Sequence, residues 1–167
     1  MMKQKDPIAG RLIVAVTGAS GAIYATRLLA ACLGLGLQID LIVSEYGKRL
    51  LLEECALDLN AEPVSEWLDR HYGTTGRHGQ IKFHDPLDLG AGIASGSQHR
   101  DGMAVVPCSM RTLAGISQGL SSNLIERAAD VTLKESRPLI LVPRETPLSL
   151  IQLENMTRAA RSGATLL

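Results

Sequence analysis

Residues 122–145 read SNLIERAADVTLKESRPLILVPRE, and they join a charged helical pattern to a short apolar segment. Residues 122–135 predict a helix, and the apolar residues 139–142 predict a buried strand. Arg144 and Glu145 follow shortly after that strand. Because α/β proteins bind ligands at the carboxyl ends of their strands, the stretch predicts an α/β fold with a site for an anionic substrate and for proton transfer.

The rest of the chain repeats this alternation of apolar and helical segments. Apolar runs predict further buried strands at residues 12–16, 39–43 and 103–106. Helical patterns occupy residues 21–33, 45–55, 65–71, 110–119 and 149–161. Near-continuous apolar strands between helices are typical of parallel sheets that are covered on both faces. We therefore expect a doubly wound, mostly parallel sheet with helices on both faces, a Rossmann-like α/β fold.

The middle and the end of the chain are the least regular parts. Residues 58–100 are polar and predict one helix followed by loops rich in Gly and His. Residues 164–167 follow a helix stop at Gly163 and look like the start of another strand. We expect one domain over residues 1–167 that either lacks a C-terminal element or closes its sheet with a very short strand.

Composition and charge exclude several classes of function. The formal net charge is zero and no basic block occurs, which argues against a nucleic-acid-binding surface. The longest apolar stretches are far shorter than the ~20 residues of a membrane span, and the polar start lacks the apolar core of a signal peptide. A cytoplasmic protein is therefore expected. No metal site is expected, because the usual ligand spacings are missing among Cys32, Cys55, Cys108, His71, His78, His84 and His99.

The first loop that carries chemistry is TGASGA, residues 17–22, between the first predicted strand and helix. Its small residues let a ligand approach the backbone, and the helix start offers free N–H groups to an anion. Gly18, Ala19 and Ser20 are therefore candidates for binding a phosphate or a flavin. The alternative is a tight turn in which Ser20 caps the helix. The loop lacks the G-x-G-x-x-G spacing of nicotinamide-binding proteins.

The second loop is PCSMRT, residues 107–112, after the strand at 103–106. Ser109 and Thr112 either cap the following helix or bond a phosphate and a ring carbonyl. Cys108 is interpreted as a small buried side chain, because no base or metal partner is evident.

The third candidate is the opening stretch itself. On a helix, Arg127 and Lys134 share a face because they are seven residues apart. The alternative is a solvated face with salt bridges, since Glu126, Asp130 and Lys134 follow the i, i+4 spacing. The Arg144–Glu145 pair nearby favours a functional cluster.

Several segments together resemble the flavin prenyltransferase family. They are VTGASGAIYA (16–25), Ser44, ASGS (94–97), PCSMRTLAGI (107–116), NLIERAADVTLKE (123–135), RPLILVPRETPLS (137–149) and LENM (153–156). The resemblance spans nearly the whole chain in order. It implies an FMN-binding domain that transfers a dimethylallyl group from dimethylallyl monophosphate to reduced FMN. Reduced FMN is therefore a substrate of the reaction.

The resemblance also implies roles for individual positions. FMN is held by Gly18, Ala19, Ser20, Ser44, Ser109, Met110, Arg111, Thr112 and Arg144. The prenyl phosphate faces Arg127, Lys134 and Arg144. Glu54 and Glu145 handle protons, with Ser20 near the flavin N5. Cations stabilise the departing phosphate, so this chemistry needs no metal.

The resemblance extends to partners and to the length of the chain. It implies a homo-oligomer, expected to be a dodecamer, with sites built between subunits, and a downstream decarboxylase that uses prenylated FMN. Family members continue past a segment like GATLL (163–167), so we expect a C-terminal truncation. One alternative is an FMN-binding or storage protein without prenyl transfer. Another is a related flavin-dependent decarboxylase, although residues 21–33 lack the catalytic His of the cysteine decarboxylases.

Overall fold

A computed structural model describes residues 10–74 and 79–167. Within these residues, six parallel strands form one sheet in the order β3-β2-β1-β4-β5-β6. The strands are β1 (Arg11–Val16), β2 (Gln38–Val43), β3 (Gln80–His84), β4 (Gly102–Cys108), β5 (Leu139–Pro143) and β6 (Thr165–Leu166). The predicted doubly wound parallel sheet is confirmed. The strand order reverses between β1 and β4, the point at which such sheets bind ligands.

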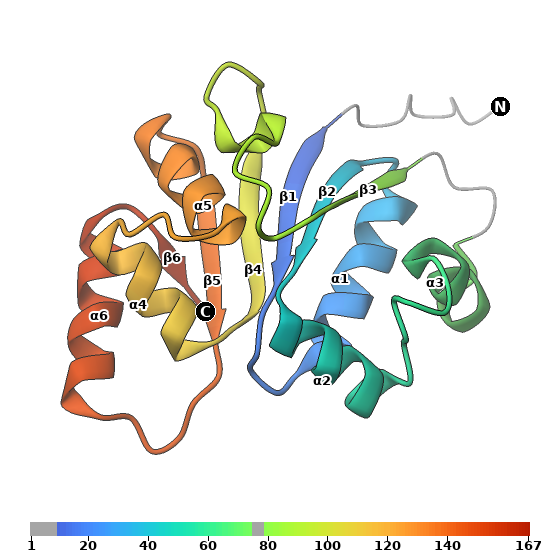
Figure 1. The fold of residues 1–167 in the computed structure, drawn as a ribbon, viewed down its shortest axis with the longest axis horizontal. Helices are drawn as coiled ribbons and strands as arrows, with labels where there is room; N and C mark the ends of the chain where they lie inside the picture. Colours follow the sequence, from blue (N-terminus) through green and yellow to red (C-terminus); the bar gives the residue numbers. More distant parts are fainter. Residues whose placement is uncertain (1–9, 75–78) are drawn as a thin grey trace, which may run out of the picture.

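Helices cover both faces of the sheet (Figure 1). One face carries α1 (Ala22–Gly34), α2 (Glu45–Cys55) and α3 (Val64–Tyr72), and the other carries α4 (Met110–Gln118), α5 (Leu124–Lys134) and α6 (Leu150–Arg161). Along β1, Ile13 and Ala15 pack into one core cluster, whereas Val14 and Val16 pack into the other. The apolar run of this strand is continuous because both of its sides are buried.

Polar caps place several helix starts at the carboxyl edge of the sheet. Four helices begin at a side chain that accepts an N–H from the first turn, and the capping residues are Ser44, Ser109, Asn123 and Ser149. A cap of this kind satisfies one of the free N–H groups of a helix start. The Asn123 cap also explains why α5 begins at Leu124 rather than at residue 122.

The region expected to hold mainly loops contains a strand. The predicted helix at 65–71 is present as α3, but β3 follows it, so the prediction of loops alone was wrong. Among residues 10–74 and 79–167, this edge strand pairs only with β2, and most of its side chains are exposed or half-buried. Main-chain hydrogen bonds therefore define it, and it needs no apolar run. Residues 75–78 of the same region lie outside the described residues.

Two further elements complete the fold. A 3-10 helix, η1 (Gly92–Ala94), lies in the connection from β3 to β4. β6 pairs with β5 as a two-residue strand, which was one of the two alternatives for the end of the sequence. The described part of the chain contains no helix with the length and apolar character needed to cross a membrane.

Candidate active site

A pocket of about 480 Å³ opens at the carboxyl edge of the sheet, where the strand order reverses. Its size is within the range of small-molecule and cofactor sites. It is lined by Gly18, Ser44, Glu45, Tyr46, Pro86, Leu87, Ser109, Arg111, Thr112, Asn123, Ile125 and Glu126. The structure therefore places parts of the two predicted loops around one cavity, together with the start of the stretch 122–145.

Thr17 joins the first two loops across the switch point. Its buried hydroxyl donates to the carbonyl oxygen of Pro107 at 2.9 Å and accepts the N–H of Ser109 at 2.7 Å. Because both bonds cross from β1 to β4, they set the spacing between the loops that form the pocket. Sequence reasoning missed this role, although the position of Thr17 between an apolar strand and small residues was a usable signal.

Gly18 is required by a close approach to α2. A Cβ atom added at Gly18 would lie 2.6 Å from the Cβ of Tyr46, closer than van der Waals contact permits. Both residues line the pocket. The next residue, Ala19, is buried, and its N–H bonds the carbonyl oxygen of Thr17. The glycine therefore lets the loop lie against Tyr46.

The starts of α2 and α4 face the same pocket. Ser44 accepts the N–H of Gly47 at 3.1 Å, and Ser109 accepts the N–H of Thr112 at 3.2 Å. Helix starts carry partial positive charge and favour anions, and the guanidinium of Arg111 adds a full charge at this wall. A pocket with two such termini, hydroxyls and a cation fits the phosphate of FMN, and its size fits an aromatic ring system.

Glu54 occupies the start of α1, which follows the loop that contributes Gly18 to the pocket. Its Oε2 accepts the N–H groups of Gly21 at 2.9 Å and Ala22 at 2.8 Å. The sequence predicted that these N–H groups were free for a ligand anion, and the structure corrects this, because a carboxylate of the protein takes them. Burial raises the pKa of Glu54, but hydrogen bonds from Gly21, Ser20 and Ala22 and the charge of Arg144 outweigh burial and lower that pKa.

Arg144 reaches the same loop from the segment after β5. Its Nε donates to the carbonyl oxygen of Ser20 at 3.4 Å. The structure thus brings Ser20, Glu54 and Arg144 together from three segments of the chain. An ionised carboxylate beside a guanidinium and a hydroxyl can stabilise developing charge of either sign and hold a proton in place.

Other predicted residues have different surroundings. Glu145 is exposed, and its Oε1 accepts the N–H of Thr146 at 3.1 Å. The Met110 side chain packs against the core. Cys108 is buried as expected, and burial raises the pKa of its thiol to about 12. Over residues 10–74 and 79–167, no group of three or more His, Cys, Asp or Glu side chains is arranged to hold a metal ion.

The two predicted cations of α5 contact other parts of this chain. The Nε of Arg127 donates to the carbonyl oxygen of Ala94 at 3.1 Å, and its Nη1 lies 3.1 Å from Oδ2 of Asp130. Lys134 is the exposed last residue of α5. In the described residues, neither cation hydrogen-bonds to Glu54 or Arg144. Their phosphate-binding role stays a prediction.

Seven of the twelve residues that line the pocket were not predicted from the sequence. The unpredicted lining residues are Glu45, Tyr46, Pro86, Leu87, Asn123, Ile125 and Glu126. Some carried a local signal, since Glu45 and Tyr46 directly follow Ser44 and Asn123 precedes a helical pattern. Pro86 and Leu87 carried none, because they lie in the polar middle of the chain.

Comparisons with known proteins identify the family of this chain. The Flavoprotein family model matches residues 3–167. The flavin prenyltransferase UbiX of Halalkalibacterium halodurans is 43% identical over 158 residues, which are 95% of this chain and 75% of that protein. The chain belongs to the flavoprotein family and, within it, to the flavin prenyltransferases.

Two solved structures share the fold closely. A dodecameric FMN-dependent UbiX-like decarboxylase from Escherichia coli O157:H7 has a TM-score of 0.81 and 41% identity, covering 93% of this chain and 78% of that one. AnUbiX (PadA1), in complex with FMN and dimethylallyl pyrophosphate, has a TM-score of 0.80 and 38% identity, covering 95% and 77%. These similarities extend over nearly all of the described fold.

Proposed function

We propose that this protein joins the dimethylallyl group of dimethylallyl monophosphate to reduced FMN and releases phosphate. The single observation that carries the proposal is the cluster of Ser20, Glu54 and Arg144 around the loop after β1, because the same loop contributes Gly18 to the pocket of about 480 Å³. Membership of the flavin prenyltransferases supports the reaction class. Reduced FMN supplies the nucleophilic nitrogen, so the protein needs no activated Ser or Cys.

The FMN phosphate binds where the starts of α2 and α4 meet. Ser44, Ser109, Arg111 and Thr112 offer hydroxyls and a cation there. Met110 acts through its main-chain N–H, because the first turn of a helix leaves such groups free. The remaining predicted FMN contacts are the backbone of Gly18 and Ala19, together with Ser20 and Arg144.

The acidic and the cationic side chains have different roles in the prenyl transfer. Glu54 stays ionised because its pKa is lowered, and its negative charge is assigned to stabilise the positive charge that develops on the allyl group. Arg144 balances the charge on the departing phosphate. Glu145 moves a proton during ring closure, a step for which its exposed carboxylate is free to turn.

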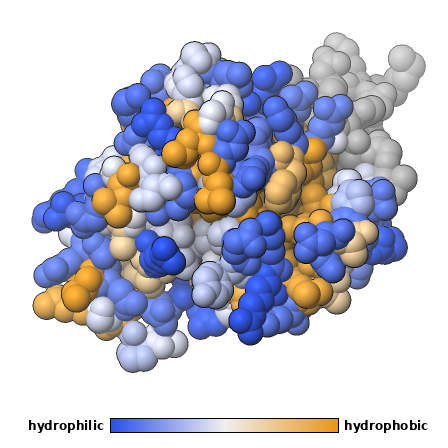
Figure 2. Space-filling view, in the orientation of Figure 1, coloured by the Kyte–Doolittle hydropathy of each residue, from blue (hydrophilic) through white to orange (hydrophobic). Residues whose placement is uncertain are grey.

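We further infer a homo-oligomer, of the dodecameric size named for the Escherichia coli O157:H7 neighbour. Figure 2 shows apolar surface at the lower left, over the start of α6, where Leu150 and Ile151 are each 70% exposed. A groove of about 700 Å³ runs along the same helix. In such an assembly, Arg127 and Lys134 contact the prenyl phosphate in a site built between subunits.

In this proposal, a second enzyme uses the product. Prenylated FMN passes to a partner decarboxylase in the cytoplasm. Adding the reaction mixture to such an apo-decarboxylase tests this link, since activation that requires both FMN and the prenyl phosphate supports it. Activation by FMN alone contradicts it.

The decisive experiment is an anaerobic incubation with dithionite-reduced FMN and dimethylallyl monophosphate, followed by mass spectrometry of the extracted flavin. A mass increase of C₅H₈ with release of one phosphate is expected. A parallel reaction with dimethylallyl pyrophosphate identifies the preferred ester. Bound FMN that is recovered unchanged from both reactions rejects prenyl transfer and leaves the FMN-storage alternative.

A further inference from the structure

One buried carboxylate ties both ends of the connection between β3 and β4. This connection, residues 85–101, is called the crossover, because the strand order makes it pass over β2 and β1. Oδ1 of Asp40, in β2, accepts from Nε2 of His84 at 2.6 Å, directly before the crossover. Oδ2 of the same residue accepts from Nε of Arg100, near the end of the crossover. The crossover is thereby fastened to the sheet at its beginning and at its end.

Asp40, His84 and Arg100 together are called the clamp, and their side chains are almost completely buried. Asp40, His84 and Arg100 are only 6%, 7% and 8% exposed. Burial raises the pKa of Asp40, but the hydrogen bonds and charges of Arg100 and His84 outweigh burial and lower it. A buried ionic cluster adds little net stability compared with an apolar core, because desolvation offsets the attraction. What the cluster provides instead is a fixed position of the crossover on the sheet.

That geometry matters at the pocket. Pro86 and Leu87 follow His84 closely in the chain, and both line the cavity assigned to FMN. Pro86 is buried, and its carbonyl oxygen accepts the N–H of Leu124 at 2.8 Å. Leu87 is 78% exposed although it is apolar. The clamp on one side and the start of α5 on the other therefore hold an exposed apolar side chain at the pocket.

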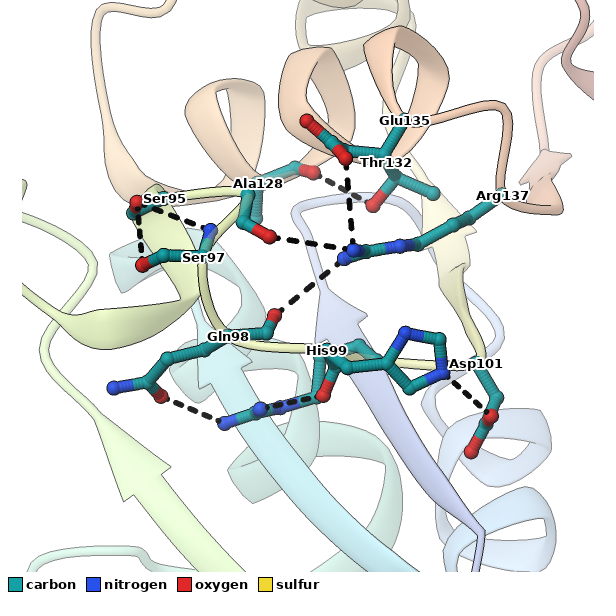
Figure 3. A network of polar contacts seen from close by, with 11 residues as sticks. Ser95, Ser97, Gln98, His99, Asp101, Ala128, Thr132, Glu135 and Arg137 are labelled. Carbon is teal, nitrogen blue, oxygen red and sulfur yellow. Dashed lines mark hydrogen bonds and ion pairs between the residues drawn. The ribbon is translucent and has the colours of Figure 1, made fainter.

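Other arginines fasten the later part of the crossover to α5 and the turn after it. Figure 3 shows Arg137 reaching this segment, where its Nη2 donates to the carbonyl oxygen of Gly96 at 3.3 Å and its Nη1 to that of Gln98 at 3.4 Å. Arg127 donates to the carbonyl oxygen of Ala94 at 3.1 Å. These bonds support residues 94–98, whereas the clamp holds the pocket-lining start of the crossover.

We propose that Asp40, acting through His84 and Arg100, is a positioning residue that sets the crossover wall of the pocket, so that Leu87 packs against the flavin ring. The inference rests on the proposed binding of FMN. It predicts that loss of the clamp moves Leu87 and weakens FMN binding in a protein that remains folded.

The test uses the full chain and titration with FMN, followed by quenching of flavin fluorescence. Arg100→Gln is expected to weaken FMN binding about tenfold, equivalent to ~1.4 kcal/mol. Arg100→Lys, which keeps a cationic donor, is expected to recover part of that affinity. The matched control is Arg70→Gln, which breaks an exposed ion pair with Glu62 outside the crossover and is expected to bind as the wild type does.

A double-mutant cycle separates positioning from general stabilisation. Leu87→Ala alone is expected to weaken FMN binding several-fold, but to add little in the Arg100→Gln background, because the side chain is already displaced there. Two outcomes overturn this inference but leave the proposed function standing. One is that the effects of the two substitutions on FMN binding are additive. The other is that Arg100→Gln binds FMN as the wild type does and only lowers the melting temperature. A wild-type protein that does not bind FMN overturns the proposed function as well.

Discussion

Oε2 of Glu54 lies 2.8 Å from the main-chain nitrogen of Ala22, so a carboxylate at the end of α2 caps the start of α1. A helix start is where a flavoprotein of this topology is expected to hold a ligand anion. Because Glu54 takes that position, we propose that the phosphate of the ligand binds at the starts of α2 and α4. The carboxylate lies near Ser20 and Arg144, where the proposed function gives it a role in catalysis.

Replacing Glu54 tests this assignment. Glu54→Gln keeps an oxygen for the N–H groups of Gly21 and Ala22 but removes the negative charge. We expect the single-turnover rate of prenyl transfer to fall about 100-fold, the usual cost of removing one group that stabilises charge in the transition state, while FMN affinity changes little. The control is Glu53→Gln, a change of the same kind at the exposed partner of Arg49. Equal rates in the two variants would remove Glu54 from the mechanism.

Glu145 is predicted to act after FMN has bound. Glu145→Gln is expected to leave the FMN dissociation constant unchanged, because this side chain bonds only the N–H of Thr146 among the described residues. The rate of product formation is expected to fall at least about tenfold, since the variant cannot transfer a proton. Stopped-flow absorbance of the flavin measures both quantities. A fully active variant rules out this role.

Gly18→Ala probes the contact with α2. The new methyl group meets the Cβ of Tyr46 at 2.6 Å in the present geometry, so one of the two pocket walls must move. We expect FMN binding to weaken about tenfold, a cost of ~1.4 kcal/mol. The double variant Gly18→Ala/Tyr46→Gly removes the clash and is expected to bind better than Gly18→Ala alone. If Tyr46→Gly gives no recovery, the clash is not the cause.

Lys134 is predicted to bind the prenyl phosphate and not FMN. Lys134→Ala is expected to raise the KM for dimethylallyl monophosphate about tenfold at low ionic strength, with no change in FMN affinity, because one cation contact to a phosphate is lost. Lys82→Ala, at the exposed edge strand β3, is the control. Unchanged steady-state kinetics of the Lys134 variant in the assembled oligomer contradict the prediction.

Acid stability should depend on Asp40. Its pKa is lower in the folded protein than in the unfolded chain, so the unfolded state binds more protons at mildly acidic pH. The stabilisation is present above the ordinary Asp value of about 4 and is lost as the pH falls through the lowered folded value. Urea unfolding midpoints from about pH 6 to 3 measure this loss. Asp40→Asn is expected to flatten the dependence of the unfolding midpoint on pH. The control is Glu66→Gln, at an exposed side chain, which is expected to leave this dependence unchanged.

The elements with strong local patterns were predictable. The strands at 12–16, 39–43, 103–106 and 139–142 are near-continuous apolar runs. The structure buries most residues of the first three, whereas the strand at 139–142 is buried on one face and half-buried on the other. The polar edge strand β3 was missed, since main-chain pairing with β2 holds it and its side chains are largely exposed. Burial leaves a pattern in the sequence, but edge pairing does not.

The sequence by itself determined the parallel sheet and the loops at its carboxyl edge, because strand direction sends every such loop to the same side. Only the tertiary structure decided which side chains meet there. Glu54 bonds Gly21 across 33 positions, and Arg100 bonds Asp40 across 60. Contacts of this length depend on how whole elements pack, and packing leaves no local periodicity. The loops after β1 and β4 and the segment after β5 could therefore be predicted from the sequence, whereas the capped start of α1 and the clamp on the crossover could not.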